Sequence, residues 1–157
     1  MQWSDVLNDK SLSNLPYKIE LNEYGQIVMS PASNQHGFLQ VEIAFFLRTQ
    51  KTGKVITECS IDTPKGVKVA DVAWGTSEFF LKNGLATPYQ FAPELCVEIL
   101  SPSNLRQEIN EKISLYLQQG AKEVWICNQY GNVEIYSDAG KIENSTLFQN
   151  LPKNFEY

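Results

Sequence analysis

The sequence predicts an α/β or mixed α+β fold, in which a mixed β-sheet is flanked by helices. Short segments of alternating or β-branched residues are separated by turn residues, and two longer segments show the apolar spacing of a helix. In chain order they read ββ-α-βββ-α-ββ, which is typical of layered sheet-and-helix domains. A length of 157 residues suffices for a substantial core, and we expect residues 1–157 to form one domain.

The predicted strands are runs of β-forming residues between turn signals. The first two surround the turn at residues 22–25, and the last two surround a Tyr-Gly turn at residues 130–131. The segment 82–93 contains a glycine and two prolines and is expected to be a loop. The expected strands are Tyr17–Leu21, Gln26–Ser30, Lys54–Ile61, Val67–Trp74, Glu94–Leu100, Glu123–Asn128 and Asn132–Ser137.

The two predicted helices have recognisable starts and ends. The first begins after Ser33 or Asn34, either of which can cap it, and runs to about Arg48 before a Thr-Gly pair. The second occupies residues 104–119. The Ser-Pro-Ser-Asn run at 101–104 is expected to cap it, and Gly120 to end it.

Composition excludes several classes of protein. No apolar run approaches the roughly 20 residues of a membrane span, and the first ten residues lack the basic and apolar regions of a signal peptide. The three cysteines lie in apolar, strand-like runs without CxxC spacing, so we expect reduced core residues and a cytoplasmic protein. One histidine excludes a multi-histidine metal site. A net charge of −5 argues weakly against nonspecific binding of nucleic acid by bulk charge, and it does not exclude a local cationic groove.

Lys112 occupies an unusual position in the second helix. At 100° per residue it falls among the apolar residues, between Leu115 and Tyr116, while the glutamines lie on the opposite face. A lysine on an inward face is costly unless its ammonium reaches a carboxylate, an anion or water. We therefore expect Lys112 to have a specific anionic partner.

Two carboxylates also break the rules of their strands. Glu98 lies in a strand that is apolar on both faces, so it should be buried or face a cleft; a strand-end glutamate paired with a surface cation is the alternative. Asp71 lies in the middle of the strand Val67–Trp74, where aspartate is disfavoured; an edge-strand or bulge position would also explain it.

Glu42 is the fourth ionisable group at an unexpected position. Helical spacing places it between Phe38 and Phe46 on an apolar face, although a partly exposed structural glutamate is an equal alternative. His36 lies opposite that face, and we expect it to cap the helix or lie at the surface. Carboxylates are the ligands that Mg²⁺ and Mn²⁺ prefer, and a lysine can stabilise negative charge in a transition state. Glu42, Asp71, Glu98 and Lys112 are therefore predicted to form one cation-binding cluster.

The motifs around these residues resemble those of a known family, Uma2. These uncharacterised bacterial proteins, abundant in cyanobacteria and formerly called DUF820, belong to the PD-(D/E)XK nuclease superfamily, which has a restriction-endonuclease-like fold. The resemblance extends over essentially the whole chain. Its motifs are Ala70-Asp71-Val72, Val97-Glu98-Ile99-Leu100-Ser101-Pro102-Ser103, and Glu108, Lys112, Tyr116, Gly120 and Val124-Trp125-Ile126 at their family spacing.

The resemblance implies specific roles for these positions. Asp71 and Glu98 match the acidic residues of the superfamily motif. The motif lysine would fall at Leu100, and in the Uma2 pattern Lys112 matches the lysine that replaces it. Glu42 resembles a helical glutamate that many members place beside the metal.

Three further positions bear on the resemblance to the family. Ala70 stands where the motif usually has proline, and Glu108 where Uma2 proteins usually have aspartate. Glu108 and Tyr116 are expected to support the site, Glu108 through a charge four residues before Lys112.

The implied function is Mg²⁺- or Mn²⁺-dependent hydrolysis of phosphodiester bonds, with DNA as the expected substrate and a homodimer as the expected assembly. Asp71, Glu98 and Lys112 would be the catalytic residues, and Asp71, Glu98 and Glu42 would bind the metal.

The main alternative is a catalytically inactive protein of the same fold that binds nucleic acid or protein, which the acidic composition and the lack of a basic stripe favour. A third interpretation is a dimerisation module whose aromatics cover a partner instead of the core: Trp74, Phe79, Phe80, Tyr89 and Phe91.

Overall fold

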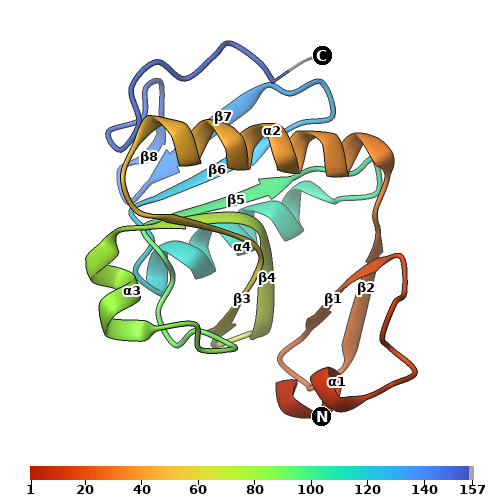
Figure 1. Ribbon diagram of the computed structural model, residues 1–157. Helices are drawn as coiled ribbons and strands as arrows, with labels where there is room; N and C mark the ends of the chain where they lie inside the picture. The colour runs from red at the N-terminus through yellow and green to blue at the C-terminus, as the bar shows by residue number, and fades with distance from the viewer. Residues whose placement is uncertain (156–157) are drawn as a thin grey trace.

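The computed structural model describes residues 1–155 and confirms the mixed α/β class, with a helix–strand order close to the predicted one (Figure 1). Two helices and one short strand were not predicted: α1, α3 and β8. The elements are α1 (Trp3–Asn8), β1 (Tyr17–Leu21), β2 (Ile27–Pro31), α2 (Asn34–Gln50), β3 (Lys54–Thr63), β4 (Gly66–Gly75), α3 (Ser77–Asn83), β5 (Leu95–Ile99), α4 (Arg106–Gln118), β6 (Glu123–Cys127), β7 (Val133–Ser137) and β8 (Gly140–Ile142).

The main sheet contains six strands in the order β3-β4-β5-β6-β7-β8. All neighbouring pairs are antiparallel except β5 and β6, which are parallel and are connected by α4. A parallel pair needs such a crossover connection, and the helix places its apolar face on the sheet. The arrangement brings the carboxyl end of β5 close to the start of α4, so Glu98 and Lys112 lie near each other.

The central strand β5 is covered on both faces. Cys96 lies in the core on the α4 side, with Ile113 and Tyr116, whereas Val97 and Ile99 face the α2 side. This confirms that β5 alternates between two apolar faces, as expected for a central strand. The three cysteines are free and buried.

The hairpin β1–β2 forms a separate two-stranded sheet that lies with α1 at one side of the main body (Figure 1). It packs on β4, and its small apolar core includes Leu21 and Val67. Gly66 is required at this junction, because it has a φ of +88° and an added Cβ would lie 2.3 Å from the carbonyl oxygen of Leu21. The hairpin is therefore fixed to the sheet at one end of β1.

The structure adds a helix where the sequence had given no prediction, and the predicted cap of α4 was wrong. Residues 77–83 form α3 because the Thr76 side chain caps the helix at Phe79 and Gly84 ends it. The N-cap of α4 is Leu105, which is 63% exposed, while Asn104 instead accepts a hydrogen bond from the Ser101 N–H.

The structure places most of the aromatic residues considered for a partner surface in the core. Trp74, Phe79, Phe80 and Tyr89 are buried, whereas Phe91 is exposed. Among residues 1–155, no helix combines the length and the apolar character needed to cross a membrane.

Candidate active site

The site begins at a break in the pairing of β3 and β4. The two strands pair on both sides of Glu58 and Asp71, but these two residues are not themselves partners. Glu58 has a φ of +53°, a left-handed conformation that is unfavourable for a residue with a side chain. Gln40 of α2 spans the break, because its amide donates to the Glu58 carboxylate at 2.7 Å and to the Asp71 carbonyl oxygen at 2.8 Å. Such local irregularity redirects side chains, and here it accompanies an inward-facing Asp71.

The Asp71 carboxylate is completely buried and makes three polar contacts. The Ile99 N–H donates to Oδ2 at 2.7 Å, Lys18 Nζ donates to Oδ1 at 3.0 Å, and His36 Nε2 lies 3.2 Å from Oδ1. Burial alone would raise the pKa of Asp71, but Lys18 and His36 outweigh it and lower that pKa well below its usual range. The hydrogen bond to Asp71 in turn raises the pKa of His36. Asp71 is therefore an ionised, strongly held carboxylate.

Glu98 lies beside Asp71 and has a different environment. Tyr116 donates its hydroxyl hydrogen to Oε1 at 2.6 Å, Lys18 donates to Oε2 at 2.9 Å, and Lys112 Nζ is 3.3 Å from both oxygens. Burial raises the pKa of Glu98, even though the charges of Lys112 and Lys18 oppose the change. The two neighbouring carboxylates thus have pKa values shifted in opposite directions, which is an arrangement typical of catalytic sites.

Strand β1 supplies two charged side chains from one face. Lys18 and Glu20 are two residues apart, so both point toward the site. Glu20 accepts hydrogen bonds from Lys112 Nζ at 2.8 Å and from the Val69 N–H at 2.7 Å. Burial alone would raise the pKa of Glu20, but the charges of Lys112 and Lys18 lower it. Three carboxylates and two ammonium groups are therefore held in one network.

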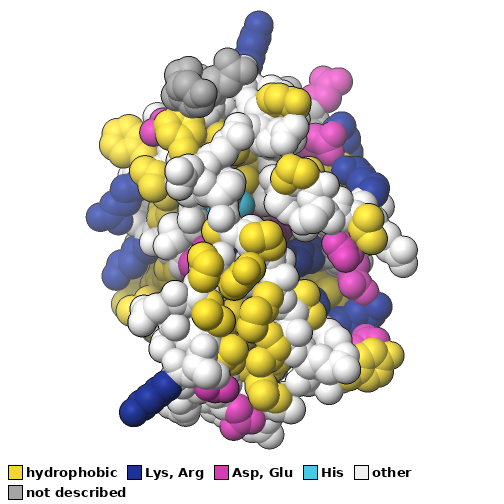
Figure 2. Space-filling view, turned by 90° about the vertical axis from the view of Figure 1, so that its right-hand side faces the viewer, with side chains coloured by type: hydrophobic (Ala, Val, Ile, Leu, Met, Phe, Trp, Pro, Cys, Tyr) yellow, Lys and Arg dark blue, Asp and Glu magenta, His cyan; other side chains and the backbone are white. Residues whose placement is uncertain are grey.

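A cavity of about 220 Å³ opens above this network. Figure 2 looks onto this face, where the cyan side chain of the one histidine lies in a recess above an apolar patch. Acidic and basic side chains are scattered around the edge of the face and form no continuous basic stripe (Figure 2). The cavity is lined by ionisable side chains from the hairpin, α2, β3, β5 and α4, namely Lys18, His36, Glu58, Glu98 and Lys112.

The comparisons with known proteins agree on a family. Residues 9–153 match the model of the Uma2 family, whose description is "Putative restriction endonuclease". The chain belongs to the Uma2 family. A crystal structure of a putative nuclease belonging to DUF820 from Anabaena variabilis has the same fold, with a TM-score of 0.70, 17% sequence identity and 87% of each chain covered. No curated protein matches the sequence.

Four of the residues predicted from the Uma2 motifs lie together in the structure. Asp71 and Glu98 are neighbours, Lys112 contacts Glu98, and Tyr116 donates to it. Lys112 thus points to carboxylates and not to bulk solvent, with a side chain that is 15% exposed.

Glu42 and Glu108 do not join this cluster. Gln40 faces the site, and Glu42 lies roughly 160° away from it around the helix. Within residues 1–155, no hydrogen bond or ion pair joins Glu42 to either Asp71 or Glu98. Glu108 is exposed and accepts a hydrogen bond from the Leu105 N–H at 3.2 Å, so it caps α4 and does not pair with Lys112.

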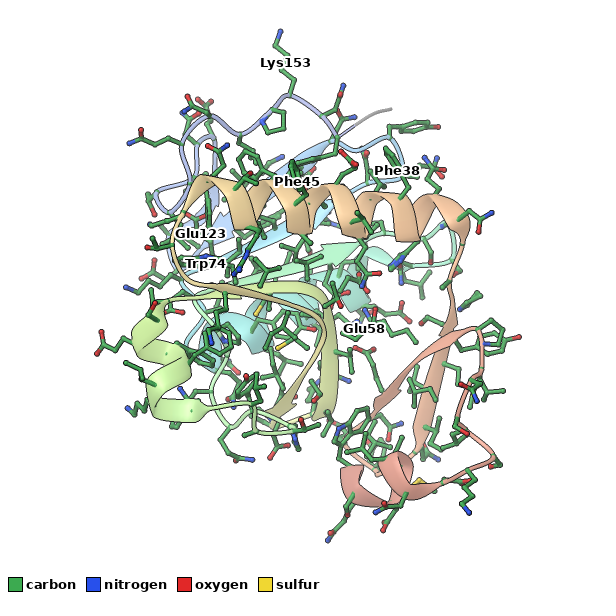
Figure 3. The ribbon with its side chains drawn as sticks, in the orientation of Figure 1. Phe38, Phe45, Glu58, Trp74, Glu123 and Lys153 are labelled. Atoms are coloured by element: carbon green, nitrogen blue, oxygen red, sulfur yellow. The ribbon has the colours of Figure 1, made fainter. Side chains whose placement is uncertain are left out.

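The inward face of α2 explains both the misplaced glutamate and the missed histidine. Its buried residues are Leu39, Ile43 and Leu47, whereas Phe45 is 66% exposed. Figure 3 shows Phe38 and Phe45 on the side of α2 away from the sheet. The sequence prediction took the aromatic residues of α2 to mark its buried face, and it therefore placed Glu42 on the buried face and His36 on the exposed one. In the structure, the buried face is instead marked by the aliphatic residues.

The donor set fits a divalent cation such as Mg²⁺. One oxygen of Asp71 and one of Glu98 lie within 3.0 Å of a single cationic atom, Lys18 Nζ, so the two carboxylates already converge on one positively charged position. Mg²⁺ is commonly held by one or two carboxylates, with water and phosphate oxygens completing its shell. In the described chain no three His, Cys, Asp or Glu side chains are grouped to hold a metal, so a cation here would have two protein carboxylates.

Proposed function

We propose that this Uma2 protein is a metal-dependent endonuclease that hydrolyses phosphodiester bonds of nucleic acid, with DNA as the substrate. The observation that carries the proposal is the convergence of Asp71 and Glu98 on one cationic position at the floor of a charged cavity. A divalent cation bound there supplies Lewis-acid polarisation of the phosphate and makes water easier to ionise. Family membership supports nuclease chemistry.

The side chains of the chain itself have complementary roles. The N–H of Ile99 fixes one oxygen of Asp71, and Tyr116 fixes one oxygen of Glu98, so each carboxylate keeps its other oxygen directed at the shared position. Lys112 lies at the same cavity and can screen negative charge that develops on the phosphate. His36, held by Asp71 at the cavity wall, can accept or donate a proton near neutral pH.

The alternative is a catalytically inactive protein of this fold that binds nucleic acid or protein. It is favoured by the ion pairs of Lys18, which already place one positive charge between the two carboxylates without a metal, and by the net charge of −5. Both functions use the same cavity, but only the endonuclease requires it to bind a cation.

Calorimetric titration with Mg²⁺ and Mn²⁺ separates the two functions. The proposal predicts binding by the wild type that is lost in Glu98→Gln, while Glu42→Gln binds as the wild type does because Glu42 lies elsewhere on α2. Absence of binding by the wild type at millimolar metal would favour the inactive alternative.

Nicking of supercoiled plasmid tests the role of Lys112 in turn. Lys112→Ala should abolish Mg²⁺-dependent nicking and retain a folded circular-dichroism spectrum, whereas the exposed Lys122→Ala should nick normally. Equal activity in Lys112→Ala would show that this lysine has no catalytic role.

We also propose a homodimer, because cutting both strands of a duplex requires two sites, which a twofold pair would supply. Sedimentation equilibrium tests this: a purely monomeric protein at working concentration would contradict it.

A further inference from the structure

Lys18 lies where the proposed cation would bind. Its Nζ is 3.0 Å from Asp71 Oδ1 and 2.9 Å from Glu98 Oε2, so it bridges the two carboxylates. A divalent cation held by Asp71 and Glu98 would need the same two oxygens that now accept from Lys18 Nζ. The ammonium and the metal ion are both positive and need the same oxygen atoms, so they cannot occupy this position together.

Lys18 is the member of the network that can leave with the least disturbance. Its side chain lines the open cavity and is 12% exposed, and a lysine ammonium is carried on a flexible four-carbon stem. Its neighbour on the same face of β1, Glu20, is held separately by Lys112 and by the Val69 N–H. Movement of the Lys18 side chain therefore leaves the attachment of β1 to β4 in place.

Departure of the Lys18 ammonium would change the charge balance of the network. Glu20, Asp71 and Glu98 supply three carboxylates against the two ammonium groups of Lys18 and Lys112. His36, 3.2 Å from Asp71 Oδ1, adds a positive charge only when it is protonated. Without the Lys18 ammonium, Asp71 and Glu98 form a pair of buried carboxylates with too little positive charge. Such a pair attracts a divalent cation strongly, as long as the cation can reach it from the cavity.

We propose that Lys18 is a built-in competitor of the divalent cation, and that metal binding requires its ammonium to leave the Asp71–Glu98 pair for the cavity. This inference rests on the proposed metal-dependent function of the same site. Lys18 thereby lowers the affinity of the free protein for metal and keeps the carboxylates paired when metal is scarce. Lys112 has a different role, because its shortest ion pair is with Glu20.

Calorimetric titration of metal-free protein with Mn²⁺ tests the competition. Lys18→Met should bind Mn²⁺ at least tenfold more tightly than the wild type, and Lys18→Arg, which keeps the charge, should stay close to the wild type. Lys82→Met is the control, because it removes an exposed lysine on α3 and should change the affinity less than twofold. Lys18→Gln replaces Lys18→Met if the latter does not fold.

Labelling of the wild type with an amine-reactive acylating reagent provides a test that needs no variant. Mn²⁺ should increase modification of Lys18 severalfold relative to Lys82, measured by mass spectrometry of peptides. Mn²⁺ binding with unchanged Lys18 labelling, or with no tighter binding in Lys18→Met and Lys18→Gln, would overturn the competitor role while leaving the metal site intact. Failure of both the wild type and the Lys18 variants to bind Mn²⁺ would instead refute the proposed function, and the competitor role with it.

Discussion

Replacing Tyr116 with phenylalanine should destabilise the protein through one defined hydrogen bond. The Tyr116 hydroxyl is completely buried and donates to Glu98 Oε1 at 2.6 Å. The substitution removes one oxygen atom and keeps the ring, so the packing of α4 on the sheet is retained. The Glu98 oxygen then loses its shortest hydrogen bond inside the core.

The expected magnitude depends on the charge and burial of the acceptor. A hydrogen bond to a charged group contributes about 1.5–3 kcal/mol, and a buried partner that is left unpaired costs most. Lys112 remains 3.3 Å from the same oxygen, so we expect a loss near the middle of that range, about 2 kcal/mol. For a chain of this length, that corresponds to a fall in Tm of about 6 °C.

Tyr136→Phe provides a matched control. Tyr136 also donates to a glutamate oxygen at 2.6 Å, but the acceptor, Glu134, has a side chain that is 42% exposed. The same hydroxyl accepts a hydrogen bond from Arg106 at 2.7 Å, and the Arg106 side chain is 60% exposed. Water can replace both of these hydrogen bonds, so the control should lose less than about 1 kcal/mol.

Urea denaturation followed by tryptophan fluorescence measures both variants, and equal m-values would show that the same surface unfolds. If Tyr116→Phe costs no more than Tyr136→Phe, then burial does not strengthen the Tyr116–Glu98 bond, and the view of Glu98 as a desolvated carboxylate is wrong.

Two further predictions concern ionisation and the C-terminal segment. Asp71 raises the pKa of His36, so the stabilisation from the charged histidine should be complete below about pH 6.5 and be lost as the pH rises through the folded-state pKa. Urea denaturation in EDTA at several pH values should show this loss of unfolding free energy in the wild type and not in His36→Gln. The same pH dependence of stability in His36→Gln as in the wild type would contradict the prediction. Glu123 is fully buried and accepts hydrogen bonds from Trp125 Nε1 at 2.9 Å and from the Thr146 N–H at 2.6 Å. Glu123→Gln should therefore lower the free energy of unfolding by at least about 2 kcal/mol. The control Glu143→Gln changes an exposed glutamate and should lower it by less than about 0.5 kcal/mol. Equal urea midpoints for the two glutamine variants would contradict this stabilising role of Glu123.

Half of the site was predictable because its residues stand at positions where charged side chains are unfavourable. The fold was predictable because its strands and helices follow regular apolar patterns. An aspartate in the middle of a strand, a glutamate in a strand that is apolar on both faces and a lysine on an inward helix face each need a specific partner, and the structure brings Asp71, Glu98 and Lys112 together. The apolar alternation of β5 likewise predicted a central strand covered on both sides.

The other half was hidden because its residues obey local rules. In β1 the sequence Tyr-Lys-Ile-Glu-Leu alternates like an ordinary surface strand, with Lys18 and Glu20 on the polar face. Only the packing of the hairpin on β4 turns that polar face toward the site. His36 and Gln40 have ordinary spacing in α2, and their roles arise from the passage of the helix over the break in β3 and β4, which depends on contacts far apart in the chain.

The central claim is that Asp71 and Glu98 bind a divalent cation. A crystal grown with Mn²⁺ and measured at the manganese absorption edge tests it most directly. The claim predicts an anomalous peak at coordination distance from one oxygen of each carboxylate, with the Lys18 ammonium displaced into the cavity. A Lys18 ammonium that still bridges the two carboxylates, with no anomalous peak beside them at millimolar Mn²⁺, would contradict it.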